Sequence, residues 1–201
     1  MNPGAARRAA IGDESDGEGA IRIEIVLDGH GRAAVATGDA FLDHLLGLTE
    51  RHADFDLTVG VATPSLGAGG GSDVEGDAES GAGSDVEAVA VAVGRALRAA
   101  LGEGQTIRRF GWATVPVVEA LALVALDLSS GPFLAYDIDF SGVRIEAFDA
   151  DRAGRFLRAL VDAAGITLHV RLLSGSDPHN IVDAVFEGLG EALRTACGVV
   201  S

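Results

Sequence analysis

The residues of this chain best suited to chemistry are histidines and carboxylates on amphipathic stretches. His44 and His52 lie eight residues apart in one stretch, and Glu87 and Asp183 each lie near the start of another. Imidazole and carboxylate groups can hold a divalent cation or move protons. They also have structural roles, because histidines suit the polar face and the C-terminal turn of a helix, and carboxylates suit the first turn. The residue types alone leave both interpretations open.

The segment 41–59, FLDHLLGLTERHADFDLTV, positions the two histidines. Its leucines recur near a period of 3.6 residues, which predicts an amphipathic helix. From Phe55 to Val59 apolar and polar residues alternate, which predicts a half-buried strand. The sequence therefore predicts a helix–strand unit.

This unit occurs twice in the chain. Residues 154–170 align without a gap on residues 43–59, and residues 180–193 align on residues 84–97 with identity at six positions, Gly94/Gly190 among them. The acidic residues Glu87 and Asp183 also coincide. A separation of about one hundred residues is too long for a solenoid repeat. We therefore expect two halves of one duplicated fold.

Composition limits the class of protein. With 201 residues and 48% hydrophobic content, the chain can build one domain or two fused half-domains with a shared core. The net charge of -15 argues against nucleic acid and anionic membranes as partners. The single cysteine, Cys197, excludes an intrachain disulfide framework and is expected to be a small apolar residue of the last helix. No apolar stretch approaches the roughly 20 residues that span a bilayer, so we expect a cytoplasmic protein.

The first half is expected to contain a leader and an internal loop. Residues 1–17 are polar and glycine-rich, which predicts a mobile leader, and residues 63–83 read as a glycine-rich acidic loop. Residues 20–27 and 33–37 flank the turn Asp28-Gly29-His30-Gly31, which predicts a β-hairpin. A helix is expected at 85–100 with Asp85 as its N-cap.

The second half repeats the order of elements. Strands are expected at 112–118, 120–128, 133–140 and 165–173, a short edge at 143–148, and helices at about 150–164 and 179–196. The half-domains are then residues 18–102 and 103–201, which together form one compact domain. Each half reads as a two-layer α+β sandwich.

Four segments carry a resemblance to a known family. They are FLDHLLGLTERHADFDL, VEAVAVAVGRALRAALG, IRRFGWATVPVVEALALVALDLSSGPFLAYD and ITLHVRLLSGSDPHNIVDAVF. In this order they resemble successive blocks of imidazoleglycerol-phosphate dehydratase, and the resemblance covers residues 18–197. It implies a duplicated α+β fold of the ribosomal protein S5 domain 2-like type, homo-oligomeric from trimers to shells of 24 subunits with metal sites that join subunits. The implied activity is that of a hydro-lyase of histidine biosynthesis, which converts imidazole glycerol phosphate to imidazole acetol phosphate with two Mn2+ ions.

The resemblance also implies site residues. His44, Glu87 and His179 match metal ligands of the family, and Asp183 replaces a glutamate ligand with a side chain one methylene shorter. Four further ligand positions hold residues that cannot do the same work, namely Gly83, Ser84, Arg155 and Asn180. Half of the eight ligand positions are therefore lost, which predicts weak binding of manganese.

The residues at the substrate-binding positions of the family also differ in part. Glu18 matches the catalytic or substrate-contacting glutamate of the family and is taken as the catalytic residue. His52 matches a substrate-side histidine, and Arg109 matches an arginine of the phosphate-side block, so both are taken as substrate-binding residues. A phosphate-binding arginine is replaced by Gly131 and a lysine by Glu187. The reaction needs metals on the substrate ring and a carboxylate for protons, because the departing proton has no adjacent carbonyl and the leaving group is a hydroxyl.

Two main hypotheses follow from this pattern. The chain is either an active dehydratase with a weakened metal site, or a catalytically impaired paralogue, a pseudoenzyme, that acts as an assembly or binding partner. In both cases we expect trimers or looser shells that respond little to a chelator. A weaker alternative is that carboxylates of the acidic loop, Asp73, Glu75, Asp77 and Glu79, bind a hard cation such as Ca2+.

Overall fold

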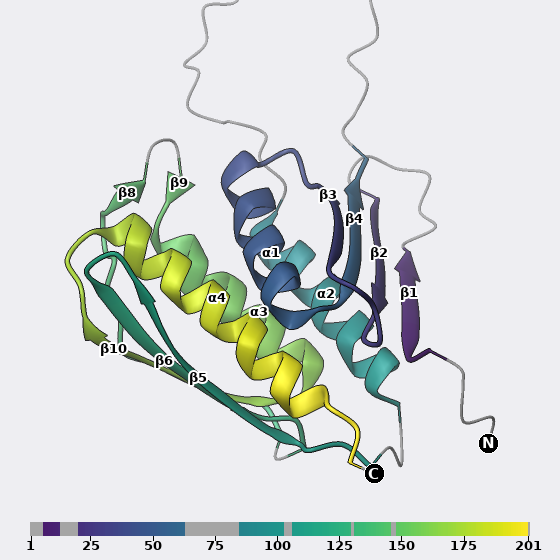
Figure 1. Ribbon diagram of the computed structural model, residues 1–201. Helices are drawn as coiled ribbons and strands as arrows, with labels where there is room; N and C mark the ends of the chain where they lie inside the picture. The colour runs from purple at the N-terminus through teal and green to yellow at the C-terminus, as the bar shows by residue number, and fades with distance from the viewer. Residues whose placement is uncertain are drawn as a thin grey trace, which may run out of the picture.

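Two four-stranded sheets lie on the outer sides of the molecule, and four helices fill the space between them (Figure 1). The structure, a computed structural model, describes residues 6–12, 20–62, 85–102, 106–129, 131–145 and 148–200. Glu18 and the 63–83 loop, including the four carboxylates considered for Ca2+, lie outside these residues. None of the described helices is long and apolar enough to cross a membrane.

The first sheet has the strand order β1-β2-β4-β3. Its strands are β1 (Arg8–Gly12), β2 (Ile21–Val26), β3 (Arg32–Ala36) and β4 (Asp56–Val61). Helix α1 (Ala40–Ala53) connects β3 to β4, and α2 (Val86–Leu101) packs on β1 and β2. The predicted helix–strand unit is thus confirmed as α1 and β4.

The second sheet repeats this order as β5-β6-β10-β7. Its strands are β5 (Phe110–Val117), β6 (Ala120–Asp127), β7 (Phe133–Tyr136) and β10 (Thr167–Ser174), and β8 (Arg144–Ile145) pairs separately with β9 (Phe148–Asp149). Helix α3 (Asp151–Ala164) precedes β10, and α4 (Pro178–Cys197) packs on β5 and β6. In both sheets the two central strands are antiparallel and the last strand pairs in parallel. The duplicated α+β fold predicted from the sequence is confirmed.

Two local expectations are wrong. Residues Arg8–Gly12, assigned to the leader, form β1 and pair with β2. β2 and β3 do not form a hairpin, because β4 lies between them. The turn bends over the start of β4, where the Asp56 carboxylate accepts hydrogen bonds from the backbone N–H groups of His30 (2.8 Å) and Arg32 (3.2 Å). A parallel crossover through α1 therefore overrides the local turn signal.

The helices of the two halves cross at equivalent glycines. A Cβ atom on Gly190 would lie 2.4 Å from the Thr49 carbonyl oxygen of α1, and one on Gly94 would lie 2.7 Å from the Leu160 carbonyl oxygen of α3. Thr49 and Leu160 are themselves equivalent in the sequence alignment of the two halves. The α4–α1 crossing is therefore the counterpart of the α2–α3 crossing.

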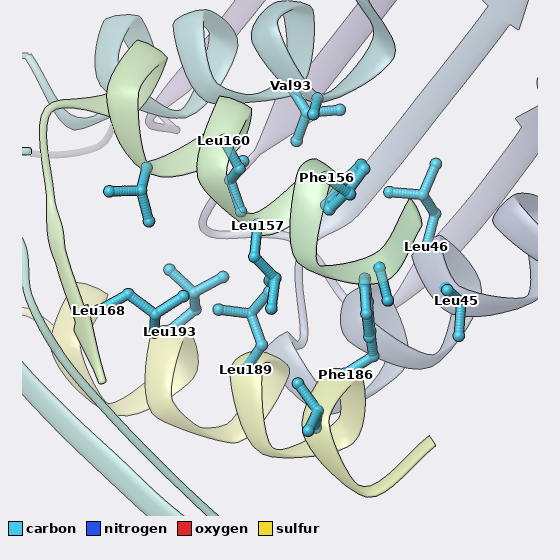
Figure 2. Packing of buried hydrophobic residues seen from close by; sticks show 14 of the residues in the cluster. Leu45, Leu46, Val93, Phe156, Leu157, Leu160, Leu168, Phe186, Leu189 and Leu193 are labelled. Atoms are coloured by element: carbon cyan, nitrogen blue, oxygen red, sulfur yellow. The ribbon is translucent and has the colours of Figure 1, made fainter. Parts of the chain in front are cut away.

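The core lies where the four helices meet (Figure 2). Phe156 of α3 and Phe186 of α4 place their ring centroids 5.6 Å apart at its centre, and Leu46 of α1 and Val93 of α2 are also buried there. Cys197 is buried at the end of α4 as expected, and this burial raises the pKa of its thiol to about 12. By contrast, Phe110, Trp112 and Phe133 of the second sheet remain exposed.

Candidate metal centre

The N-terminal turns of α1 and α4 are fixed by aspartate caps. The Asp39 carboxylate accepts hydrogen bonds from the backbone N–H groups of Phe41 and Leu42, both at 3.1 Å. At α4 the Asp177 carboxylate accepts the N–H of His179 at 2.9 Å, and Pro178 occupies the first turn. Both caps satisfy donors that a helix leaves unpaired, and so they fix where each helix begins.

These two helix starts bring together His44, His179 and Asp183. His44 Nε2 lies 3.1 Å from Asp183 Oδ1, and His179 Nε2 lies 3.5 Å from Asp183 Oδ2. One ligand atom from each residue lies within 4.8 Å of the others. The Asp183 side chain is only 14% exposed, whereas the imidazoles are 42% and 45% exposed. The carboxylate thus forms the inner wall of a cluster that opens to solvent.

Phe41 packs beside both imidazoles of this cluster. Its ring centroid lies 5.7 Å from that of His179 in an edge-to-face arrangement and 6.1 Å from that of His44. The ring limits how far the two imidazoles can turn, which favours one arrangement of the ligand atoms.

The turn between β5 and β6 contributes a residue that the sequence analysis did not assign to the site. The Glu119 carboxylate accepts hydrogen bonds from the backbone N–H groups of Ser176 (3.1 Å) and Asp177 (2.8 Å) and from Asn180 Nδ2 (2.7 Å). These donors, led by the N–H of Asp177, lower the pKa of Glu119 to about 2. Glu119 therefore holds the segment that carries His179, and Asn180 points toward Glu119. The sequence places the Glu119 carboxylate on a tight turn between two expected strands, but no sequence pattern links this turn to α4.

Glu87, the fourth predicted metal ligand, does not join this cluster. It lies on α2, where its Oε1 is 3.3 Å from Arg155 Nη1 of α3. A cavity of about 1090 Å3 opens beside this ion pair. Its charged lining consists of three arginines and four carboxylates, namely Arg95, Arg155, Arg158, Glu87, Asp149, Asp151 and Asp162.

The predicted substrate-binding residues also lie apart from the cluster. His52 has its Nδ1 2.9 Å from the Leu48 carbonyl oxygen and its Nε2 3.8 Å from Glu187 Oε2. Arg109 makes a bidentate pair with Asp127, at 2.7 and 2.8 Å, which raises the pKa of its guanidinium. Its backbone N–H donates to the Ala196 carbonyl, near the other end of α4 from His179. A 20-residue helix is about 30 Å long, so one chain does not bring Arg109 to the cluster.

The donor set of the cluster fits a divalent transition metal. Two imidazole nitrogens and one carboxylate oxygen suit Mn2+, Fe2+ or Zn2+, and three protein ligands leave positions for water or substrate. The exposed side of the imidazoles provides access. The arrangement can therefore hold a cation against the carboxylate wall formed by Asp183.

Comparisons with known proteins show the family of this chain. The family model described as imidazoleglycerol-phosphate dehydratase matches residues 37–193. A relative of that name from Trichlorobacter lovleyi is 37% identical over 190 residues, which cover 94% of this chain and 91% of the relative. Another from Acetivibrio thermocellus is 40% identical over 180 residues, 90% of this chain and 86% of the relative.

Solved structures show the same fold. The crystal structure of imidazoleglycerol-phosphate dehydratase from Staphylococcus aureus has a TM-score of 0.76 at 24% identity, with 96% of this chain and 99% of that chain covered. The enzyme from Pyrococcus furiosus gives a TM-score of 0.70 at 27% identity, with 95% of each chain covered.

Proposed function

The chain belongs to the imidazoleglycerol-phosphate dehydratase family, and we propose that it dehydrates imidazole glycerol phosphate to imidazole acetol phosphate in histidine biosynthesis. The convergence of His44, His179 and Asp183 from two helices is the observation that carries this proposal. These residues would hold a divalent cation, for which Mn2+ is the choice that the family implies.

A cation held by these residues would supply Lewis-acid polarisation to the substrate. His44 and His179 would each donate a ring nitrogen to the cation. Asp183 holds both imidazoles in place and offsets the charge of the cation. The open side of the cluster admits the substrate.

The protons of the reaction are assigned to a carboxylate. Dehydration breaks one C–H and one C–O bond and forms a C=C bond, so one water is lost and an enol is formed. The enol then gains a proton on carbon and loses one from oxygen, which gives the ketone of imidazole acetol phosphate. By resemblance Glu18 takes the proton from carbon, a role that needs a carboxylate within hydrogen-bond reach of the substrate. His52 is proposed to contact the substrate, and its pairing with Glu187 is then exchanged for that contact.

Self-association is part of the proposal. Arg109 lies at the opposite end of α4 from His179, so in an assembly it serves the site of another copy. Such an arrangement would provide a cationic contact for the substrate phosphate between copies. Trimers, or shells of up to 24 subunits, are the assemblies that the family implies.

The proposal is tested with the full-length chain loaded with Mn2+ and assayed on imidazole glycerol phosphate. We expect turnover that falls at least about 100-fold in His44→Ala and in His179→Ala, since each removes a metal ligand. His30→Ala is the matched control, because His30 lies in the turn before β3 and should leave the rate unchanged. Stoichiometric Mn2+ without turnover in the wild-type chain would overturn the proposal.

A second candidate function is that of a catalytically impaired partner of a complete paralogue. The Arg155–Glu87 pair favours it, as does Glu187 beside His52, because both place charges that the family pattern lacks. Native mass spectrometry of the chain co-expressed with a family member that keeps metal ligands at the positions of Gly83, Ser84, Arg155 and Asn180 should then show mixed assemblies. Full activity of this chain alone, with no mixed assemblies, would exclude the second candidate.

A further inference from the structure

Because the helices are duplicated, the metal centre at the start of α1 and α4 can be compared with the equivalent positions at the start of α3 and α2. We call these two places the α1–α4 copy and the α2–α3 copy. The alignment of the two halves places Arg155 where α1 has His44, Glu87 where α4 has Asp183, and Gly83 where α4 has His179. In one copy His44 Nε2 lies 3.1 Å from Asp183 Oδ1, and in the other Arg155 Nη1 lies 3.3 Å from Glu87 Oε1. The same pair of positions is in contact in both copies.

We infer that the α2–α3 copy has exchanged its metal ion for the guanidinium of Arg155, so that each chain binds one divalent cation, at the α1–α4 copy, instead of two. The inference rests on the proposed function only for the cation at His44, His179 and Asp183. For the α2–α3 copy, we infer from the residues present there that no metal binds.

Ligand chemistry supports this exchange. Guanidinium stays protonated and has no lone pair to donate, so Arg155 cannot ligate a cation. It already supplies a positive charge to Glu87, as a metal would. Two like charges in contact repel each other, and the double charge of a divalent cation would strengthen its repulsion by Arg155. Solvent exposure of Arg155 reduces the repulsion but leaves the ligand missing.

The surroundings give no replacement ligand set. Asp149 and Asp151 line the same cavity as Arg155 and Glu87, but within the described part of the chain only His44, His179 and Asp183 offer three ligand atoms that converge. Two further guanidinium groups, of Arg95 and Arg158, line that cavity. The α2–α3 copy is therefore a poor place for a second divalent cation.

The test counts Mn2+ per folded chain by elemental analysis after gel filtration. We expect about one ion in the wild type and none in Asp183→Ala, because the remaining copy does not bind. The variant Gly83→His/Ser84→His/Arg155→His restores an imidazole ligand at each of these three ligand positions of the α2–α3 copy and should bind about two ions. Gly83→His/Ser84→His, which keeps Arg155, is its matched control and should still bind about one.

Several outcomes would overturn the inference. These are two ions in the wild type, one ion retained in Asp183→Ala, two ions in the control variant, or a folded restored variant with no gain. If the wild type binds none and the restored variant binds one, the absence of metal binding at the α2–α3 copy stands, and the proposed metal centre at the α1–α4 copy fails. Should the restored variant not fold, Glu87→Ala decides, since the inference requires that it leave the Mn2+ content of the wild type unchanged.

Discussion

The α1–α4 and α2–α3 helix pairs have the same crossing but different side chains at their N-terminal ends. At the crossings, Gly190 and Gly94 meet equivalent backbone atoms of α1 and α3. At the ends, one pair presents His44, His179 and Asp183, and the other presents an ion pair. A buried crossing tolerates few changes, because a side chain there displaces backbone, whereas half-exposed ends can change freely. The two helix pairs therefore share their crossing geometry and differ in the side chains at their N-terminal ends.

The largest expected effect tests whether the two crossings are equal. Gly190→Ala and Gly94→Ala each place a Cβ atom under 3.0 Å from backbone oxygen, so each should destabilise the fold by about 1–3 kcal/mol in chemical denaturation. Gly47→Ala is the control, because nothing lies within 4 Å of its Cβ position, and it should stabilise α1 by up to about 1 kcal/mol. If only one of the two variants loses stability, the two crossings are not equivalent.

A smaller effect is expected from Glu119, which holds the segment at the start of α4 in the α1–α4 pair. Glu119→Gln removes a carboxylate that holds the loop before His179, so the Kd for Mn2+ should rise about tenfold in calorimetric titration. Because the pKa of Glu119 is lowered to about 2, its contribution to stability is present above pH 4.5 and is lost as the pH falls toward 2. An unchanged Kd would show that this loop is held by other contacts.

Glu50 allows the buried faces of α1 and α3 to be compared. It is 4% exposed, its Oε1 has no hydrogen-bond partner among the described residues, and its equivalent in α3 is the buried Val161. Burial raises the pKa of Glu50, so the unfolded chain loses this proton first and stability falls as the pH rises above 4.5. Glu50→Val should therefore stabilise the fold by about 1 kcal/mol at pH 7.

The control for Glu50→Val is to measure the same variant at two pH values. Thermal unfolding should show a gain for Glu50→Val at pH 7 that shrinks or reverses at pH 4, where the wild-type carboxyl is protonated. A gain of the same size at both values would assign it to packing instead of charge.

The smallest effect is expected from Arg155. Both partners of the Arg155–Glu87 pair are about half exposed, so Arg155→Ala should cost less than about 1 kcal/mol in thermal unfolding. Raising the salt concentration should reduce this cost further. A loss of several kcal/mol would mean that the ion pair holds α2 against α3, and the two helix ends would then matter more than the crossings.

Much of this fold follows from local sequence patterns. The helices α1 to α4 were predicted from apolar periodicity and caps, and the duplication from the alignment that pairs Gly94 with Gly190. The sheet order was missed at β2 and β3, since the turn chemistry at 28–31 is local and the insertion of β4 is not. Three of the four proposed ligands converge, because α1 and α4 each carry theirs in the first turns. Glu87 lies apart, since it belongs to the other helix pair, α2–α3, where it contacts Arg155.

Contacts between distant segments explain what was missed. Glu119 reaches Asp177 across 58 residues, which no periodicity reveals. The Arg155–Glu87 contact could have been inferred by applying the alignment of the halves to His44 and Asp183. That step also requires knowing that these two side chains touch, which only the structure provides.

The exposed side chain of Trp112 gives the molecule an optical reporter. It is the only tryptophan of the chain, it is 67% exposed, and it lies on the outer face of the second sheet, on the far side from the helices. Its fluorescence emission in an isolated subunit should therefore resemble that of indole in water. Any molecule that covers this face will shift the emission to shorter wavelength, so dilution of the protein can reveal whether its own copies do so.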